Sequence, residues 1–458
     1  MPSSNKSFRS YLSSRLSRKS TASTDEGANT HSQQSEVSDE RDDNFIEISG
    51  LDKVRANDER YQSTDGEEDQ AEHISFEKQR SLREITLKKT SVTTEYSVRK
   101  FAEKNAYIAE CSIINMILTT MQIQEHSSGH QERGCTSLWR IVSTSPATKK
   151  AILALDGISI ILNAVENHSS NQKVLEQACG ALGQLAFRDS RMSEAIGAHN
   201  GISNILKAMQ EHRDNGDVQK RCCSALCNLA FDNEINCTRI LRQGGITHFV
   251  KTMEVFFQRM DISEKVLCAM NQLTKKEASA RKCFLEKGGV ELLSEVMKVG
   301  QNHNNIMTQG CAIYSHLILD KADLGLMKII HKTSVIPLIS EKIDYFLKDS
   351  KYLWKAFHLL FQLSYRKGNS KSDLAFISRG NILDSKVIRK TSLVINSHSK
   401  DAKLLGIVSS VLRNACHEDK GRENICKYLG KDLLVQMGRD FPDDCANNVH
   451  AIIEQVDF

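Results

Sequence analysis

The chain has 458 residues, of which 40% are hydrophobic and 26% charged, with 24 glycines, 4 prolines, 13 cysteines and a formal net charge of +4. This composition excludes collagen and a wholly disordered chain. The length predicts several domains or one extended repeat array, because single hydrophobic cores stop growing at about 250 to 300 residues.

The cysteine content and the apolar segments predict where the protein resides. Thirteen cysteines fall below the density of a disulfide scaffold, and no leading apolar signal precedes them. We therefore expect reduced thiols in an intracellular protein of the cytoplasm, with the nucleus as a further compartment. Long apolar stretches such as residues 353–363 reach about half of the ~20 residues that a bilayer span needs, so no membrane span is expected.

The N-terminal segment has its own composition and charge. Residues 1–20 hold five basic side chains and no acidic one, whereas residues 21–73 hold sixteen acidic and four basic ones. Serine is abundant, aromatic residues are sparse, and neither a helical nor a strand period persists. Such a segment cannot bury enough apolar area to offset its chain entropy, so we predict a disordered, serine-rich tail over residues 1–92.

A targeting signal is the alternative for the start of this tail. In residues 1–24 apolar side chains fall on one helical face among serines and arginines, which is typical of an organelle transit peptide. Serine and arginine are also typical of a phosphorylatable disordered tail, so both interpretations stay open. The apolar residues of this face are Phe8, Tyr11, Leu12 and Leu16.

From about residue 93 the apolar residues follow a helical period, and a 44-residue repeat appears. Residues 93–458 are therefore predicted to form a repeat solenoid, regular over residues 111–317 and divergent over residues 318–458. Turn doublets recur at this step, and so does a column of large apolar residues. The doublets are Asp156-Gly157, Asn200-Gly201, Gly244-Gly245 and Gly288-Gly289; the column is Leu138, Leu182, Leu226, Met270 and Tyr314.

One repeat unit reads as a short helix followed by two longer ones. Ile202, Ile205 and Met209 share one helical stripe, and Cys222, Leu226 and Leu229 fall on a second. A shorter segment, residues 234–242, precedes a glycine turn that suits a left-handed helix end. A single unit cannot bury both stripes, so neighbouring units must stack on a continuous core.

The sequence resembles the armadillo repeat family. The resemblance rests on residues 174–186 and on Ser224-Ala225-Leu226-Cys227-Asn228-Leu229-Ala230, which look like third helices of such repeats. It implies an all-α, right-handed α-solenoid of about seven three-helix armadillo-type repeats, with residues 446–458 as a closing helix. In this family the third helices line a concave groove that binds an extended protein segment.

The resemblance also implies a set of groove residues. Family members that bind extended peptides often carry asparagine just before the last core leucine of the third helix, where its amide pairs with the ligand backbone. Asn228 occupies this position in one repeat, and Asn228→Ala is expected to weaken partner binding with little change in melting temperature. The matching positions, which we call the ladder, are Arg140, Gln184, Asn228, Gln272, His316, Gln362 and Asn414.

Two further features bear on the ligand. Import adaptors of this family resemble this chain but place tryptophan four residues before the asparagine, and none of the equivalent positions here is tryptophan. Recognition of basic import signals is therefore not expected. A groove that carries Arg133, Arg221, Lys265 and Lys355 near the ladder favours an acidic protein segment instead.

Metal binding and catalysis find no support in the residue patterns. The cysteines of one column are a repeat apart and cannot share an ion, so they are interpreted as small core residues. Phosphate loops, HExxH and GxSxG motifs are absent, and the Gly180–Gly183 pair is interpreted as a helix-packing feature. The cysteine column is Cys135, Cys179, Cys223 and Cys311.

These observations predict a non-enzymatic protein–protein interaction scaffold or adaptor, without cofactor, metal or small-molecule substrate. A transport cargo adaptor or a nucleic-acid-associated subunit that uses the basic solenoid surface is the alternative. Nucleic acid is the less favoured partner, because the few aromatic residues do not interleave with the basic ones as stacking platforms do.

Overall fold

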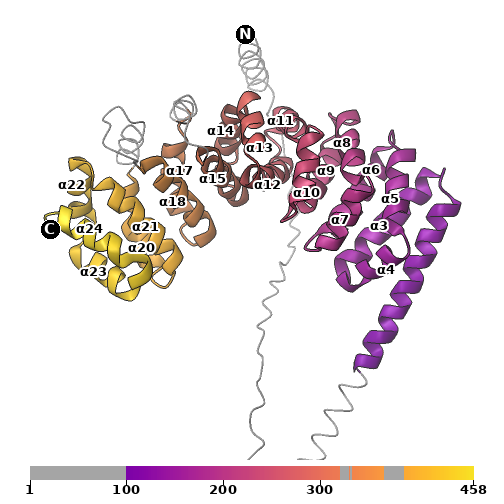
Figure 1. The fold of residues 1–458 in the computed structure, drawn as a ribbon, viewed down its shortest axis with the longest axis horizontal. Coiled ribbons are helices and arrows are strands. Elements are labelled where there is room, and N and C mark those ends of the chain that lie inside the picture. Colours follow the sequence, from indigo (N-terminus) through magenta and orange to yellow (C-terminus); the bar gives the residue numbers. More distant parts are fainter. Residues whose placement is uncertain (1–98, 320–329, 331–332, 366–385) are drawn as a thin grey trace, which may run out of the picture. The chain divides into compact units, whose positions relative to one another are not determined.

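The computed structural model of the chain describes residues 99–319, 330, 333–365 and 386–458 (Figure 1). Every described residue belongs to the unit Ile85–Phe458. The predicted tail, its division into a basic and an acidic part, and the targeting signal of residues 1–24 therefore lie outside the described residues.

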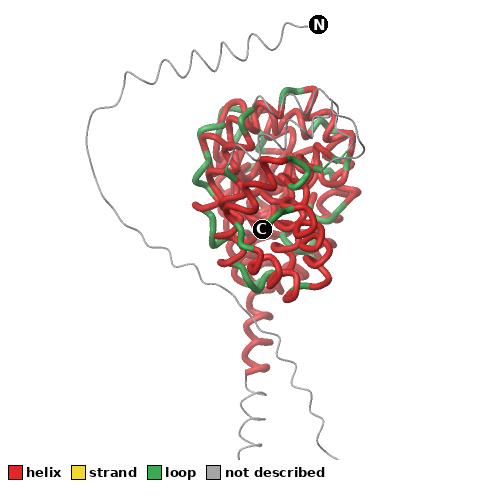
Figure 2. Tube along the Cα trace, turned by 90° about the vertical axis from the view of Figure 1, so that its left-hand side faces the viewer, coloured by secondary structure: helices red, strands yellow, loops and turns green. Residues whose placement is uncertain are grey.

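The described residues form helices joined by short loops, without a strand (Figure 2). A first long helix, Arg99–Ile123, precedes the repeats. Each regular repeat then contributes a short helix and two longer ones, as the 44-residue period predicts. The short first helices are α4 (Lys149–Ala154), α7 (Ser190–Ala198), α10 (Glu234–Arg242), α13 (Ala278–Glu286) and α22 (Asp419–Tyr428).

The second helices carry the apolar stripe that follows each turn doublet. Ile202, Ile205 and Met209 on one of them are buried, as the sequence predicts. These helices are α5 (Gly157–Asn167), α8 (Gly201–Glu211), α11 (Gly245–Phe256), α14 (Gly289–Val299), α17 (Val335–Tyr345), α20 (Val387–Ser397) and α23 (Lys431–Asp440).

The third helices form a continuous row, because each one packs against the third helix of the next repeat in chain order (Figure 1). The all-α repeat solenoid is thereby confirmed. The row consists of α3 (Ser128–Thr144), α6 (Gln172–Ala186), α9 (Gly216–Ala230), α12 (Met260–Lys276), α15 (Asn304–Ile318), α18 (Ser350–Ser364) and α21 (Ala402–Ala415).

Two helical turns and one helix complete the described elements. A 3-10 turn, η1 (Pro146–Thr148), leads into α4, and a π-helical turn, η2 (Pro442–Ala446), leads into α24 (Asn447–Gln455). Helix α24 packs against α21, which is the place that a closing helix takes at the end of a solenoid.

The turn before each second helix has left-handed backbone geometry. Asn200 has a φ of 63° and Gly244 a φ of 79°, and the other two predicted doublets also begin with a positive φ. The column continues into the divergent repeats at Ser334 and Lys386, which have φ values of 56° and 64°. The turn therefore persists where the sequence has lost its glycine, asparagine or aspartate signature.

The second glycine of a doublet serves a different purpose, which is close approach. A Cβ atom added to Gly201 would lie 2.5 Å from Ile196 Cγ2 and 2.7 Å from the Ile196 carbonyl oxygen. No side chain fits at that separation, so the contact fixes how closely α7 and α8 approach each other.

The core columns lie where the period places them. Leu138, Leu182, Leu226, Met270 and Tyr314 are each 0% exposed. Polar side chains join consecutive repeats beside this core. Asn236 Nδ2, for example, donates to the Ser193 carbonyl oxygen at 2.8 Å, and His212 Nε2 lies 2.6 Å from the Ser169 carbonyl oxygen. Repeats are thus joined by hydrogen bonds as well as by apolar contact.

One described helix, Arg99–Ile123, is long and apolar enough to cross a membrane, judged by length and composition only. Residues 106–123 of this helix form a longer stretch than residues 353–363, which served as the example of a long apolar segment, and the absence of a membrane span stays a prediction. Residues 106–123 mix serine, threonine and asparagine with apolar residues and carry one charged side chain, Glu110. Leu118 of this helix is buried against the first repeat, whereas Ile108 and Met116 are exposed.

Candidate interaction surface

Every ladder residue lies on a third helix, in the order that the repeat predicts. Arg140 on α3 is exposed, Asn414 on α21 is buried, and the five residues between them are half-buried. The ladder therefore lies along one row of packed helices, although its members differ in how much of each side chain remains available.

Three ladder residues form hydrogen bonds to the preceding repeat. Asn228 Nδ2 donates to the Gly183 carbonyl oxygen at 2.8 Å, and Asn414 Nδ2 donates to Ser364 Oγ at 3.0 Å. His316 Nδ1 lies 3.2 Å from Thr274 Oγ1. These polar groups hold neighbouring third helices together, so Asn228→Ala is no longer expected to leave the melting temperature nearly unchanged.

Close packing of α6 and α9 makes the Asn228 bond possible. A Cβ atom on Gly183 would lie 3.1 Å from Ala225 Cα, and one on Gly180 would lie 3.1 Å from the Trp139 ring. Both glycines are thus sites of close helix contact, which confirms that the Gly180–Gly183 pair is a helix-packing feature. The carbonyl of Gly183 is thereby brought within reach of the Asn228 amide.

The side chain of His316 is held neutral. Burial lowers the pKa of its imidazole to about 4, and the positive charges of Lys355, Arg281 and Lys275 and the imidazole of His358 add to the effect. The hydrogen bond between His316 Nδ1 and Thr274 Oγ1 determines which ring nitrogen carries the proton. At neutral pH this ladder position therefore presents an uncharged imidazole.

Three ladder glutamines have side-chain atoms that lack a hydrogen-bond partner among the described residues. Gln184 and Gln272 form no side-chain hydrogen bond within the described part of the chain. Gln362 Oε1 is buried and has no donor among the described residues. A buried acceptor without a donor costs free energy, so a ligand N–H that reached Gln362 would remove an existing penalty.

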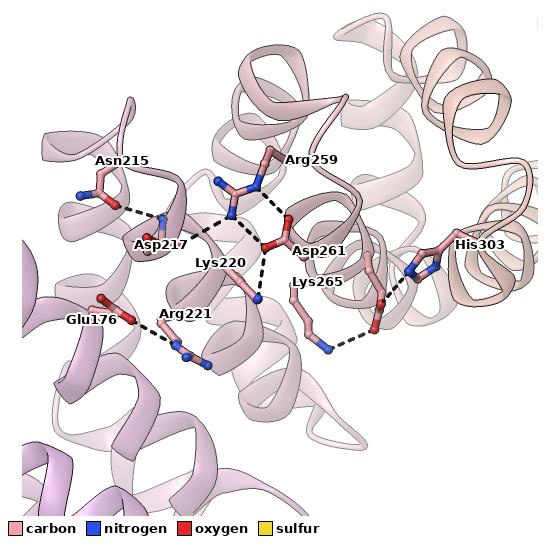
Figure 3. Close-up of polar contacts among 10 residues, drawn as sticks. Glu176, Asn215, Asp217, Lys220, Arg221, Arg259, Asp261, Lys265 and His303 are labelled. Atoms are coloured by element: carbon pink, nitrogen blue, oxygen red, sulfur yellow. Dashed lines mark hydrogen bonds and ion pairs between the residues drawn. The ribbon is translucent and has the colours of Figure 1, made fainter. Parts of the chain in front are cut away.

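A network of ion pairs crosses the first part of the row (Figure 3). Asp261 on α12 accepts from Arg259 at 2.9 Å and lies 3.1 Å from Lys220 on α9. Arg259 also lies 3.6 Å from Asp217. The hydrogen bond from Arg259 and the nearby Lys220 hold the pKa of Asp261 well below its usual range, so these charges balance one another.

Two of the predicted ligand-binding cations belong to this balanced group. Arg221 Nε lies 3.8 Å from Glu176 Oε1, and its guanidinium lies 4.2 Å from the centre of the Trp139 ring. Lys265 lies 3.1 Å from Glu264, which also lies 3.6 Å from His303 (Figure 3). Carboxylates within the solenoid therefore partly compensate Arg221 and Lys265, and their attraction for an acidic ligand stays a prediction.

Helix α18 carries an aromatic stack beside Lys355, and no pattern in the sequence connects its tryptophan with the ladder. The Trp354 ring stacks on His358 with ring centres 4.9 Å apart, and Lys355 Nζ lies 4.9 Å from the Trp354 ring centre. The import-adaptor pattern would place a tryptophan at His358, which is one helical turn after Trp354. The pattern of aromatic residues alone therefore did not reveal the stack.

The cysteines of the 44-residue column are core residues. Cys135, Cys179, Cys223 and Cys311 are buried, and burial raises the pKa of the Cys135 and Cys311 thiols to about 12. Within residues 99–319, 333–365 and 386–458, no group of three His, Cys, Asp or Glu side chains could hold a metal ion.

Comparison with known proteins supports this picture at the level of fold and family. A family model described as "Protein zer-1 homolog-like, C-terminal domain" matches residues 77–363, while no curated protein matched the sequence. The chain is similar to an engineered protein with a crystal structure, at a TM-score of 0.60 and 17% identity, over 75% of this chain and 78% of that chain.

A second engineered protein is similar at a TM-score of 0.47 and 18% identity, over 54% of this chain and 95% of that chain. At these identities the first likeness shows the fold alone, a helical repeat solenoid. The family match supports a general role as a protein-interaction scaffold.

Proposed function

We propose that this chain, which belongs to the family of Protein zer-1 homolog-like C-terminal domains, is a substrate-recognition adaptor for a ubiquitin ligase. The adaptor binds an extended segment of a partner protein along the row of third helices. It acts by presenting a surface and carries out no reaction itself, so a separate ligase subunit performs the chemistry.

One observation supports the binding of an extended segment. The third helices from α3 to α21 pack in an unbroken row, and along this row the amides of Gln184 and Gln272 are half-exposed with no hydrogen bond inside the described chain. An extended peptide has one backbone N–H and one carbonyl per residue, and side-chain amides pair with both. A row of such amides therefore suits a ligand that has no secondary structure of its own.

We further assign the repeats to the armadillo type, since a 44-residue unit of one short and two longer helices is the unit of that family. The thirteen cysteines form no disulfide, which agrees with residence inside the cell, in the cytoplasm or the nucleus.

The test is affinity capture from native lysate with the full-length chain as bait. A variant with Gln184→Ala and Gln272→Ala serves as comparison, because both side chains can be shortened without loss of an internal hydrogen bond. A second variant, Gln210→Ala, changes an exposed amide on α8, outside the row of third helices, and is the matched control.

We expect the wild type and the α8 control to recover ubiquitin-ligase subunits and a shared set of further proteins. The double variant should keep the ligase subunits and lose the further proteins, whose cellular half-lives should lengthen when the chain is absent. Equal recovery of those proteins by all three baits would place recognition outside the ladder. A lack of ligase subunits in every capture would refute the adaptor role.

A further inference from the structure

The charged side chains along the row of third helices fall into two groups. In the first group, three lysines of α9 and α12 each have a carboxylate nearby. Lys220 lies 3.1 Å from Asp261, Lys265 lies 3.1 Å from Glu264, and Lys276 lies 3.0 Å from Glu234.

The second group has no such compensation. Lys275 stands at the end of α12, and Lys351 and Lys355 stand on α18, with α15 packed between these two helices. No described carboxylate lies within 4.0 Å of their ammonium groups. We call Lys275, Lys351 and Lys355 the lysine cluster.

The lysine cluster is positive enough to affect its own members. Burial lowers the pKa of Lys355, and the positive charges of Lys275 and Lys351 lower it further. The same field acts on His358, whose pKa is lowered by burial and by Lys355. A protein that keeps like charges together pays a free-energy penalty, which an anion bound among them would relieve.

The polar side chains of α18 run along one face of the helix. Lys351, Lys355, His358 and Gln362 are spaced by four, three and four residues, so they form a single stripe. The stripe ends at the buried Gln362 Oε1, which has no donor among the described residues. A ligand that followed the stripe would meet cations first and then an acceptor that requires an N–H group.

We infer that the surface formed by α12, α15 and α18 binds an acidic stretch of the partner protein, with carboxylates at Lys275, Lys351 and Lys355 and a backbone N–H at Gln362 Oε1. This inference rests on the proposed function and adds the chemistry of the segment that is recognised. It places the acidic contact on α18 and the end of α12, because Arg221 and Lys265 already lie beside carboxylates of the solenoid.

A nucleic acid would also supply negative charge, but the surface suits it less. Bases stack on open aromatic faces, and here one face of Trp354, the tryptophan of α18, is already stacked on His358. The occupied tryptophan face therefore favours a peptide.

The test measures direct binding to the full-length chain by fluorescence anisotropy. The ligand is a short labelled peptide that alternates glutamate and serine. Two comparison ligands are the same peptide with glutamine in place of glutamate and a single-stranded DNA oligonucleotide of equal charge. The test variant carries Lys275→Gln, Lys351→Gln and Lys355→Gln. The matched control carries Lys220→Gln, Lys265→Gln and Lys276→Gln, which removes the same charge from ion-paired lysines.

We expect the glutamate peptide to bind and the glutamine peptide not to bind, with affinity that falls as salt is added. The lysine-cluster variant should lose about tenfold or more in affinity, because three charge contacts together reach that size. The control variant should stay within about twofold to threefold of the wild type. Lys351→Gln alone, at an exposed position, should lower affinity in the same direction and guards against misfolding of the triple variant.

Several outcomes would overturn the inference. These are a lysine-cluster variant that binds the peptide as tightly as the wild type, a control variant that loses as much affinity, or an oligonucleotide that binds more tightly than the peptide. These outcomes do not affect the capture experiment on Gln184 and Gln272. The adaptor role can therefore be correct even if the inferred acidic preference is wrong.

Discussion

The amide of Asn228 joins two repeats by donating to the Gly183 carbonyl oxygen at 2.8 Å. Asn228→Ala should therefore lower the free energy of unfolding by about 1 kcal/mol, the usual net value of such a bond. The midpoint of urea unfolding measures this loss. Gln184→Ala changes the equivalent ladder amide in the preceding repeat, which has no side-chain hydrogen bond to another described residue, and should leave the midpoint almost unchanged. Equal shifts for the two variants would contradict the assignment.

The imidazole of His316 makes stability depend on pH. Its pKa in the folded chain is about 4, below the value of about 6.5 in an unfolded chain. The unfolded state therefore binds more protons between these two values, so the stability is present above pH 6.5 and is lost as the pH falls towards 4.

Substitution of this imidazole tests the pH effect. His316→Gln should flatten the dependence of the melting temperature on pH between 6.5 and 4, whereas Gln272→Ala, which removes a non-ionisable side chain from the ladder, should leave its slope as in the wild type. A wild-type slope in the His316 variant would mean that other groups carry the acid sensitivity.

The positions of the ladder residues were predictable, but their use was not. A 44-residue period places Asn228, His316 and Asn414 on third helices, yet it gives no distance between helices. Whether an amide pairs with a ligand or with the preceding repeat depends on how closely the helices approach. That separation is set at Gly183, whose added Cβ would lie 3.1 Å from Ala225 Cα.

The junction between the short helix and the second helix of a repeat requires a glycine, because the two helices contact each other too closely there for a side chain. Gly201→Ala would place a methyl group 2.5 Å from Ile196 Cγ2, so α7 and α8 must move apart. We expect a loss of about 1–3 kcal/mol, as for other overpacked sites, measured as a lower unfolding midpoint.

The matched control for this substitution is Gly430→Ala. Gly430 precedes α23 with a φ of −71° and has no atom within 4 Å of an added Cβ. Its replacement should leave stability nearly unchanged, because alanine restricts the unfolded chain but is a poorer N-cap residue than glycine. A destabilisation of similar size at both glycines would indicate a backbone effect and not a steric one.

The same junction shows where sequence patterns stop being informative at this scale. Four turns carry glycine, asparagine or aspartate at the residue with positive φ, so their spacing predicted the repeat. Ser334 and Lys386 adopt the same geometry without that signature, because a single left-handed residue costs only about 1–2 kcal/mol and packing of the helices can offset it. Insertions in the divergent repeats also removed the constant step.

At the scale of the whole molecule, the repeat period predicted the solenoid because every column of the core is a direct consequence of stacking similar units. Charge compensation across repeats could not be predicted in the same way. Arg221 and Lys265 occupy one column, yet Arg221 meets Glu176 of the preceding repeat and Lys265 meets Glu264 of its own helix. Only the packed structure separates such balanced cations from Lys275, Lys351 and Lys355.

The central proposal is that partner proteins contact the row of third helices. Photocrosslinking in cells tests this most directly, with a photoreactive amino acid placed in the full-length chain at Gln272 on α12 or, for comparison, at Gln210 on α8. We predict that Gln272 yields discrete crosslinked partners, that the Lys275→Gln, Lys351→Gln, Lys355→Gln background weakens them, and that Gln210 yields few. Crosslinks that arise mainly from Gln210 and persist in that background would contradict the account, because recognition would then lie on the second helices.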